Sequence, residues 1–154
     1  MPDRAPKGGE EALRLAFAAV RRRERSAAEI REWLARRGFD EEDVAEAIHR
    51  LEAMGELDDA RFARLYAEDK RELSDWGPER IRDALLARGV SHEHVEAALD
   101  GDSYHRQLSR ARELLERKGG DLESDVARGR ALGFLTRRGY EYEIAYEAVR
   151  RHAA

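Results

Sequence analysis

Two short clusters in this 154-residue chain have the residue types of a catalytic or metal-binding site. The first is His92-Glu93-His94, in which imidazole and carboxylate groups could ligate a metal ion. Two histidines at i and i+2 point away from each other on a helix, whereas helical metal ligands stand at i and i+4 on one face. With Ser91 in the N-cap position, the segment is better explained as the solvated first turn of a helix. We therefore expect no metal ion and no other cofactor.

The second cluster is Asp58-Asp59, which could supply paired carboxylates for acid–base chemistry. These aspartates stand where a helix of about residues 60–73 should begin. Carboxylates at a helix start accept hydrogen bonds from its free N–H groups and favour its dipole, so we expect both aspartates to cap this helix. The chain has no GxxxxGK[ST], GxGxxG or GxSxG pattern, and its Ser, His and acidic residues show no triad-like order. The sequence predicts a protein that is not an enzyme.

Arginine carries most of the positive charge of the chain. Lys and Arg total 29 against 33 Asp and Glu, for a net charge of −4, and 26 of the cations are arginine. A G+C-rich genome explains such a bias, and so does recognition of carboxylates or phosphates by planar guanidinium groups. The net charge is −2 over residues 1–57, −5 over 58–102 and +3 over 103–154. This balance argues against strong binding of nucleic acid by the whole chain.

An internal repeat indicates which elements must position these side chains. Gly38, Gly89 and Gly139 are 51 and 50 residues apart, and each lies in the same local pattern. A leucine stands four residues before each glycine, an apolar or aromatic residue stands directly after it, and a small-aliphatic pair follows at nine and ten positions. These recurring positions are Leu34, Leu85 and Leu135, then Phe39, Val90 and Tyr140, then Ala47-Ile48, Ala98-Leu99 and Ala148-Val149.

Each unit of about 50 residues is predicted to form three helices. Ile30, Trp33 and Leu34 fall at i, i+3 and i+4 on one helical face, and Ser26 with Glu29 forms a capping box at its start. The repeat glycine then ends that helix, because glycine adopts positive φ at low cost. No stretch alternates in the manner of a half-buried strand. The predicted fold is all-α, with three tandem three-helix repeats in an elongated, curved array, because small units gain stability by stacking.

The predicted organisation is a disordered tail over residues 1–11, followed by three-helix repeats over 12–57, 58–102 and 103–154. The longest apolar run, residues 15–20, is far shorter than the ~20 residues that span a membrane. The polar N-terminus has no signal-peptide core. Together with the absence of cysteine, these features favour a cytoplasmic protein without a membrane segment.

The middle unit carries the most specific motifs. The segment LDDARFARLY (57–66) is followed by WGPERIRDALLARGV (76–90), and FLTRRGYEYEIAYEAV (134–149) lies near the C-terminus. These segments resemble the RecX family, bacterial regulators of the RecA recombinase, and the resemblance extends over about residues 12–152. One departure is Arg88, which follows an alanine where the other two units have Arg-Arg. The matching motif positions are Leu57, Asp58, Asp59, Phe62, Ala63, Gly77, Arg80, Ile81, Leu85, Gly89 and Val90.

The resemblance implies a non-enzymatic negative regulator that binds RecA as a filament on single-stranded DNA. It implies suppression of the filament's ATP hydrolysis, its strand exchange and the coprotease activity that stimulates repressor cleavage. An elongated, curved array is suited to lie along the helical groove of such a filament, and we expect a monomer. The apolar and glycine motif residues should serve the core and the turns. We expect partner contacts from Arg61, Arg64, Arg71, Arg80, Arg82, Arg137 and Arg138.

The sequence leaves two alternative functions. Three-helix units can place a helix in a DNA groove, and arginine clusters such as that in residues 21–25 could hold phosphates. A stand-alone DNA-binding protein of this kind shows a steep dependence of its affinity on salt. The other alternative is a generic helical-repeat adaptor for an unrelated protein. Each single arginine could also stabilise a helix C-terminus through the helix dipole.

Overall fold

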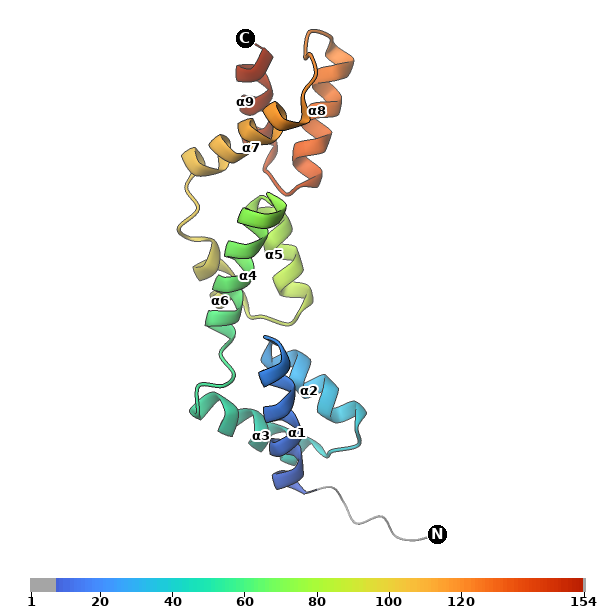
Figure 1. The fold of residues 1–154 in the computed structure, drawn as a ribbon, viewed down its shortest axis with the longest axis vertical. Coiled ribbons are helices and arrows are strands. Elements are labelled where there is room, and N and C mark those ends of the chain that lie inside the picture. Colours follow the sequence, from blue (N-terminus) through green and yellow to red (C-terminus); the bar gives the residue numbers. More distant parts are fainter. Residues whose placement is uncertain (1–7, 154) are drawn as a thin grey trace.

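The computed structural model describes residues 8–153 of the chain. Within that range the regular structure consists of nine α-helices and no strands, which confirms the predicted all-α fold. Figure 1 shows the helices stacked along one long axis, with α1 at one end of the body and α9 at the other. The helices are α1 (Gly9–Arg22), α2 (Ala27–Arg36), α3 (Glu41–Ala53), α4 (Asp59–Ser74), α5 (Pro78–Ala87), α6 (His92–Leu99), α7 (Tyr104–Lys118), α8 (Asp125–Arg137) and α9 (Tyr142–Ala153).

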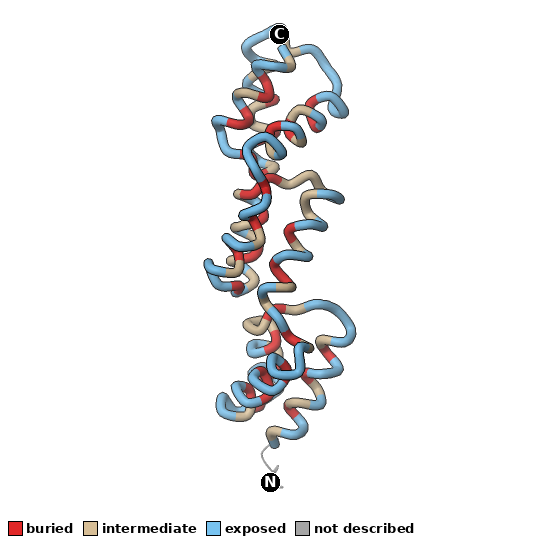
Figure 2. The backbone as a smooth tube through the Cα atoms, turned by 90° about the vertical axis from the view of Figure 1, so that its left-hand side faces the viewer, coloured by how far each residue is buried: buried red, intermediate tan, exposed pale blue. Residues whose placement is uncertain are grey.

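The helices form three groups of three, each with its own hydrophobic core. α1 packs on α3, α4 on α6 and α7 on α9, and α2, α5 and α8 complete the three groups. Buried residues lie on the inner faces of each group and exposed residues lie outside (Figure 2). The three buried clusters draw on residues 12–57, 62–99 and 108–149. We therefore propose 12–57, 58–102 and 103–154 as the folding units, and we name them the first, middle and last unit.

The repeat glycines end the second helix of each unit. Gly38, Gly89 and Gly139 have φ of +88°, +81° and +100°, a left-handed region that glycine adopts without a steric penalty. The residue after each glycine donates its backbone N–H to the carbonyl of the leucine four residues before the glycine, at 3.2–3.3 Å. This hydrogen bond closes the helix end and directs the following apolar side chain into the core. It explains the recurring Leu-x-x-x-Gly-apolar spacing.

The first helix begins within the residues that the sequence predicted as a disordered tail. Residues 9–11 form the first turn of α1 and are not part of a disordered tail. Glu10 and Glu11 lie in this turn, where their charge favours the positive end of the helix dipole. Residues 1–7 of the predicted tail lie outside the described residues.

The start of α8 also departs from the repeat pattern. α8 has 13 residues, whereas α2 and α5 have 10 each. The additional turn begins after Ser124, whose hydroxyl accepts a hydrogen bond from the Ala127 N–H at 3.1 Å. An N-cap serine stabilises a helix start by this bond. The second helix of the last unit therefore begins one turn earlier than its equivalents.

Candidate partner-binding surface

The first and middle units meet through the turn that ends α5. Ser26, at the start of α2, donates its hydroxyl to the carbonyl of Arg88 at 2.7 Å, and the Arg88 guanidinium forms an ion pair with Glu29 at 3.0 Å. A Cβ on Gly89 would lie 2.4 Å from the methyl carbon of Ala28, so the approach is too close for a larger residue. Ser26 and Glu29 also form the predicted capping box. Contacts between distant parts of the chain therefore fix this first junction.

The middle and last units meet through the equivalent turn, which ends α8. Gly77 donates its backbone N–H to the carbonyl of Arg138 at 2.8 Å, and Glu79 donates to the carbonyl of Gly139 at 2.9 Å. A Cβ on Gly77 would lie 2.5 Å from the backbone of Gly139, so this position requires glycine. Each junction thus joins the start of the second helix in one unit to the glycine turn of the next unit.

A buried ion-pair network supports the second junction. Asp102 lies between α6 and α7 with its side chain 2% exposed, and it accepts two hydrogen bonds from Arg110 at 2.6 and 2.7 Å. Arg71 on α4 approaches the same carboxylate, at 3.6 Å. Burial acts to lower the pKa of Arg110, but its hydrogen bonds and ion pair with Asp102 outweigh this and raise the pKa. The network ties the middle unit to the first helix of the last unit.

Acid is expected to weaken the first junction. Burial acts to raise the pKa of Glu29, but hydrogen bonds from the Ser26 backbone N–H and from Arg88 outweigh it and hold the pKa below its ordinary value. A carboxylate of this kind stabilises the fold above its unfolded pKa, about 4.3, and this contribution is lost as the pH falls through the folded pKa. On acidification the free energy of unfolding should therefore fall less in the Glu29→Gln variant than in the wild type.

Urea denaturation at about pH 6 and pH 3 measures this difference. Glu32→Gln is the matched control, because Glu32 lies on the same helix and is exposed. Its acid-dependent loss should equal that of the wild type. An equal loss in Glu29→Gln and the wild type would contradict a role of the Glu29 charge in the junction.

Five of the seven arginines expected to contact a partner are engaged within the chain, and two of these hold the middle unit together. Arg71 donates to the Ala98 carbonyl at 2.9 Å. Arg82 forms ion pairs with Glu79 and with Glu96, the latter at 2.7 Å. The hydrogen bond from Arg82 holds the pKa of Glu96 below its ordinary value. Both arginines therefore join helices of the middle unit to one another.

The other three engaged arginines lie near the junctions, Arg61 and Arg80 on the middle unit and Arg138 on the last unit. Arg61 donates to the Gly55 carbonyl at 3.0 Å, which belongs to the first unit. Arg138 donates to the Ser74 carbonyl at 3.0 Å, across the second junction. The guanidinium of Arg80 stacks over the indole ring of Trp76, 4.2 Å from the ring centre. Most of the expected partner contacts therefore take part in holding the array together.

Arg64 and Arg137 differ from the other five because both are exposed. Arg64 lies on the outer face of α4 and Arg137 in the last turn of α8. Within residues 8–153, neither guanidinium has a hydrogen bond or an ion pair, so both are available to a partner. The structure spreads the seven arginines over the middle unit, the two junctions and the last unit and does not join them into one cluster.

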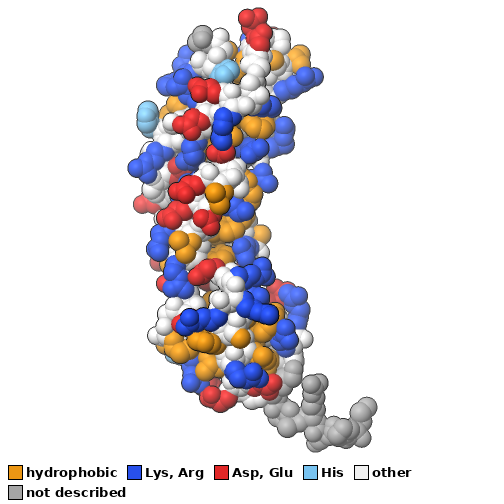
Figure 3. All heavy atoms as spheres, in the orientation of Figure 1, with side chains coloured by type: hydrophobic (Ala, Val, Ile, Leu, Met, Phe, Trp, Pro, Cys, Tyr) orange, Lys and Arg blue, Asp and Glu red, His pale blue; other side chains and the backbone are white. Residues whose placement is uncertain are grey.

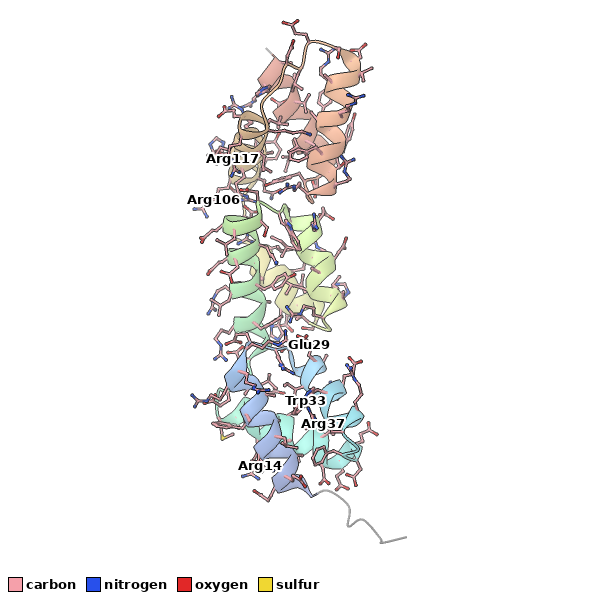
Figure 4. The ribbon with its side chains drawn as sticks, turned by 45° about the vertical axis from the view of Figure 1, so that its right-hand side comes forward. Arg14, Glu29, Trp33, Arg37, Arg106 and Arg117 are labelled. Atoms are coloured by element: carbon pink, nitrogen blue, oxygen red, sulfur yellow. The ribbon has the colours of Figure 1, made fainter. Side chains whose placement is uncertain are left out.

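The arginine before each repeat glycine has a role that the sequence analysis missed. In every unit it stacks on an aromatic ring of its own unit, and Figure 4 shows Arg37 beside Trp33. The signal available in the sequence was the recurrence of arginine directly before all three glycines. The stacked pairs are Arg37 over Trp33 at 4.1 Å, Arg88 over Phe62 at 4.7 Å and Arg138 over Phe134 at 5.0 Å.

The acidic pair at the start of α4 behaves only in part as predicted. Asp58 caps α4 by accepting a hydrogen bond from the Arg61 N–H at 3.0 Å. Asp59 does not cap α4 through its side chain but accepts from the Ala27 N–H at 2.9 Å, at the start of α2. It therefore links the first and middle units. Ser91 occupies the N-cap position of α6 but makes no side-chain cap hydrogen bond.

Residues 8–153 contain no group of three or more His, Asp or Glu side chains that could hold a metal ion. No helix in this range combines the length and the hydropathy needed to cross a bilayer.

The fold and these contacts define a tandem array of three-helix units. The apolar motif residues are buried, Leu57 in the core of the first unit and the others in the core of the middle unit. Residues 12–51 match the first three-helix domain of RecX, and residues 58–99 match the second. The buried apolar motif residues are Leu57, Phe62, Ala63, Ile81, Leu85 and Val90.

Similar proteins extend this match over nearly the whole chain. A regulatory protein RecX from Mycolicibacterium vanbaalenii is 31% identical over 157 residues, which covers 96% of this chain and 85% of the relative. A regulatory protein RecX from Thermus thermophilus is 37% identical over 142 residues and covers 92% of both chains. The chain therefore belongs to the RecX family of regulatory proteins.

Solved structures agree with this fold. The crystal structure of RecX from Lactobacillus salivarius superposes with a TM-score of 0.83 at 18% sequence identity, covering 94% of this chain and 96% of that chain. A second crystal structure of a regulatory protein RecX has a TM-score of 0.76 and covers 93% of this chain and 73% of that chain. At such low identity these likenesses show the arrangement of the helices alone.

Proposed function

We propose that this protein is a non-enzymatic negative regulator that binds the RecA recombinase filament on single-stranded DNA in the cytoplasm. Binding lowers the ATPase, strand-exchange and coprotease activities of the filament. Membership of a family of regulatory proteins supports the regulatory role. The observation that carries the proposal is the elongated stack of three units (Figure 1), because a long monomer can contact several subunits of a helical filament at once.

The junctions suggest how such contacts act on a filament. A ligand shifts a filament between states only if it binds those states with different affinity. Backbone hydrogen bonds and close glycine contacts hold the middle and last units in one relative position. Because the two units are rigidly joined, the affinity of the array for a filament depends on the spacing of neighbouring filament subunits. We propose that the array fits the groove of an inactive or shrinking filament better than that of an active one.

Arg64 and Arg137 are the two expected contacts that are free to meet a partner. They lie on different units, so the loss of both should weaken binding at two separate points. We expect the double variant Arg64→Ala/Arg137→Ala to bind the filament about tenfold more weakly, which corresponds to about 1.4 kcal/mol. Co-sedimentation with RecA filaments on single-stranded DNA measures this affinity. The free energy of unfolding should change by less than about 0.5 kcal/mol.

Arg14→Ala provides the matched control. Arg14 is exposed, has no hydrogen bond or ion pair within residues 8–153 and lies on α1 in the first unit (Figure 4), outside the seven expected contacts. We expect this variant to bind as the wild type does. Equal weakening by Arg14→Ala would indicate a general effect of charge and would contradict specific roles for Arg64 and Arg137.

A direct DNA-binding function makes a different prediction. Several phosphate contacts by arginines would give high affinity for DNA alone, with a steep fall as salt increases. The acidic middle unit opposes such binding. We therefore expect only weak binding to single-stranded DNA without recombinase. Tight, salt-sensitive binding to bare DNA would replace the proposed function by that of a DNA-binding protein.

A further inference from the structure

One face of α4 carries acidic and apolar side chains that nothing in the described chain covers. Glu68, Asp69 and Glu72 are exposed, and none of them has a hydrogen bond or an ion pair within residues 8–153. Leu73 is 81% exposed and Leu65 is 39% exposed. We call these five residues the α4 stripe. It lies on the middle unit, where Figure 3 shows acidic side chains gathered on the surface.

The α4 stripe is continuous along the helix. Leu65, Asp69 and Leu73 stand at i, i+4 and i+8, so they follow one another along a single face. Glu68 and Glu72 stand at i+3 and i+7 and border the same line. Of the buried residues of α4, Ala63 and Ala67 lie on a different side, whereas Phe62 lies in line with Asp69 and Leu73, two to three turns earlier along the helix. In the part of α4 that follows Phe62, two exposed apolar side chains are therefore bordered by three exposed carboxylates.

The stability of α4 does not explain this arrangement. Glu68 and Glu72 form a like-charge pair at i and i+4, which destabilises a helix. Glu72 also stands in the last turn, where the negative end of the helix dipole disfavours an anion. Exposed leucine contributes little to the core of its own unit. Glu68 and Glu72 also line a hollow with Arg71, Arg106 and Arg110, whose positive charge they balance. The folding of α4 still gives no use to the two exposed leucines, and contact with a partner would cover them.

We propose that the α4 stripe is a docking surface for a basic amphipathic segment of a protein partner. Lysine or arginine side chains of that segment pair with the carboxylates, and its apolar side chains cover Leu65 and Leu73. The carboxylates repel phosphate groups, so charge complementarity selects a protein and not a nucleic acid. The partner that supplies this segment is the recombinase filament, and the inference rests on the proposed function in this respect.

Charge reversal and removal of the apolar contact test this proposal on the full chain. The variants are Glu68→Lys/Glu72→Lys and Leu73→Gln, measured by co-sedimentation with RecA filaments on single-stranded DNA. Because all three side chains are exposed, circular dichroism should show an unchanged fold. We expect each variant to bind about tenfold more weakly than the wild type, which is a typical cost of losing an interface anchor.

Matched controls carry the same chemical changes elsewhere. Glu52→Lys/Glu116→Lys reverses two exposed carboxylates on α3 and α7, and Val126→Gln removes an exposed apolar side chain from α8. These variants should bind as the wild type does. If the wild type binds and the stripe variants bind equally well, the docking surface is overturned and the proposed function remains in place. Absence of binding by the wild type overturns both, and equal losses in stripe and control variants overturn the docking surface alone.

Discussion

Replacing Phe62 by alanine is expected to lower the free energy of unfolding of the middle unit by about 3 to 5 kcal/mol. The Phe62 side chain is 3% exposed and belongs to the core shared by α4, α5 and α6. Its ring stacks on Tyr66 with centroids 6.0 Å apart and lies beneath the guanidinium of Arg88. Truncation therefore leaves a cavity and also removes the aromatic support of an arginine at the first junction.

Urea denaturation followed by the fluorescence of Trp76 measures this loss. Trp33→Phe serves as the background for both proteins, so that the signal comes from the middle unit alone. Leu73→Ala is the control, because Leu73 lies on the same helix and is exposed, and its effect should stay within about 0.5 kcal/mol. A Phe62→Ala protein as stable as its background would contradict the burial of this ring.

Replacing Asp102 by alanine is expected to destabilise the protein by about 3 kcal/mol. This value stands at the lower end for a broken buried ion pair, because the side chains of Arg71 and Arg110 are still 18% exposed. The substitution leaves two arginines without the carboxylate that they share. The loss falls on the contact between the middle unit and α7, so it should weaken the second junction, which the backbone hydrogen bonds of Gly77 and Glu79 still hold.

Two further variants distinguish loss of the charge pair from a general effect of truncation. Asp100→Ala changes an exposed aspartate two residues away, and its unfolding free energy in urea should match the wild type within about 0.5 kcal/mol. The double variant Asp102→Leu/Arg110→Met replaces the pair by apolar groups and should recover part of the loss. A stable Asp102→Ala protein would show that the network does not support the second junction.

The repeat made the helical array predictable from sequence. Gly38, Gly89 and Gly139 recur at nearly equal spacing, and a glycine with an apolar neighbour has one common use at a helix end. The burial of Leu85 follows from the same recurrence, and that of Phe62 was expected because it is an apolar motif residue. Such local signals suffice because each one depends on a few consecutive residues.

The junctions could not be predicted in this way. Asp59 was expected to cap its own helix, yet it bonds the Ala27 N–H at the start of another unit. The Asp102–Arg110 pair joins residues whose separation along the chain carries no helical or turn signal. Both contacts depend on how complete units pack, and the junctions also use backbone carbonyl and N–H groups that nearly every residue possesses.

The candidate site was only partly predictable for a related reason. An arginine in a last helical turn has the same sequence signature in three different roles. It can interact favourably with the helix dipole, link two units, or remain exposed and contact a partner. The structure distinguishes Arg64 and Arg137, which are exposed, from Arg71 and Arg82, which bind neighbouring helices. The α4 stripe was hidden for the same reason, because exposed acidic residues also occur on ordinary solvated helices.

The most direct test of the account is the DNA-dependent ATP hydrolysis of the RecA recombinase, titrated with this protein. A long array that fits an inactive filament should inhibit hydrolysis at well below one molecule per recombinase subunit. The free energy of unfolding in urea confirms that the protein added is folded. Inhibition at substoichiometric amounts is the result that the account predicts. Unchanged hydrolysis in the presence of excess folded protein would contradict it.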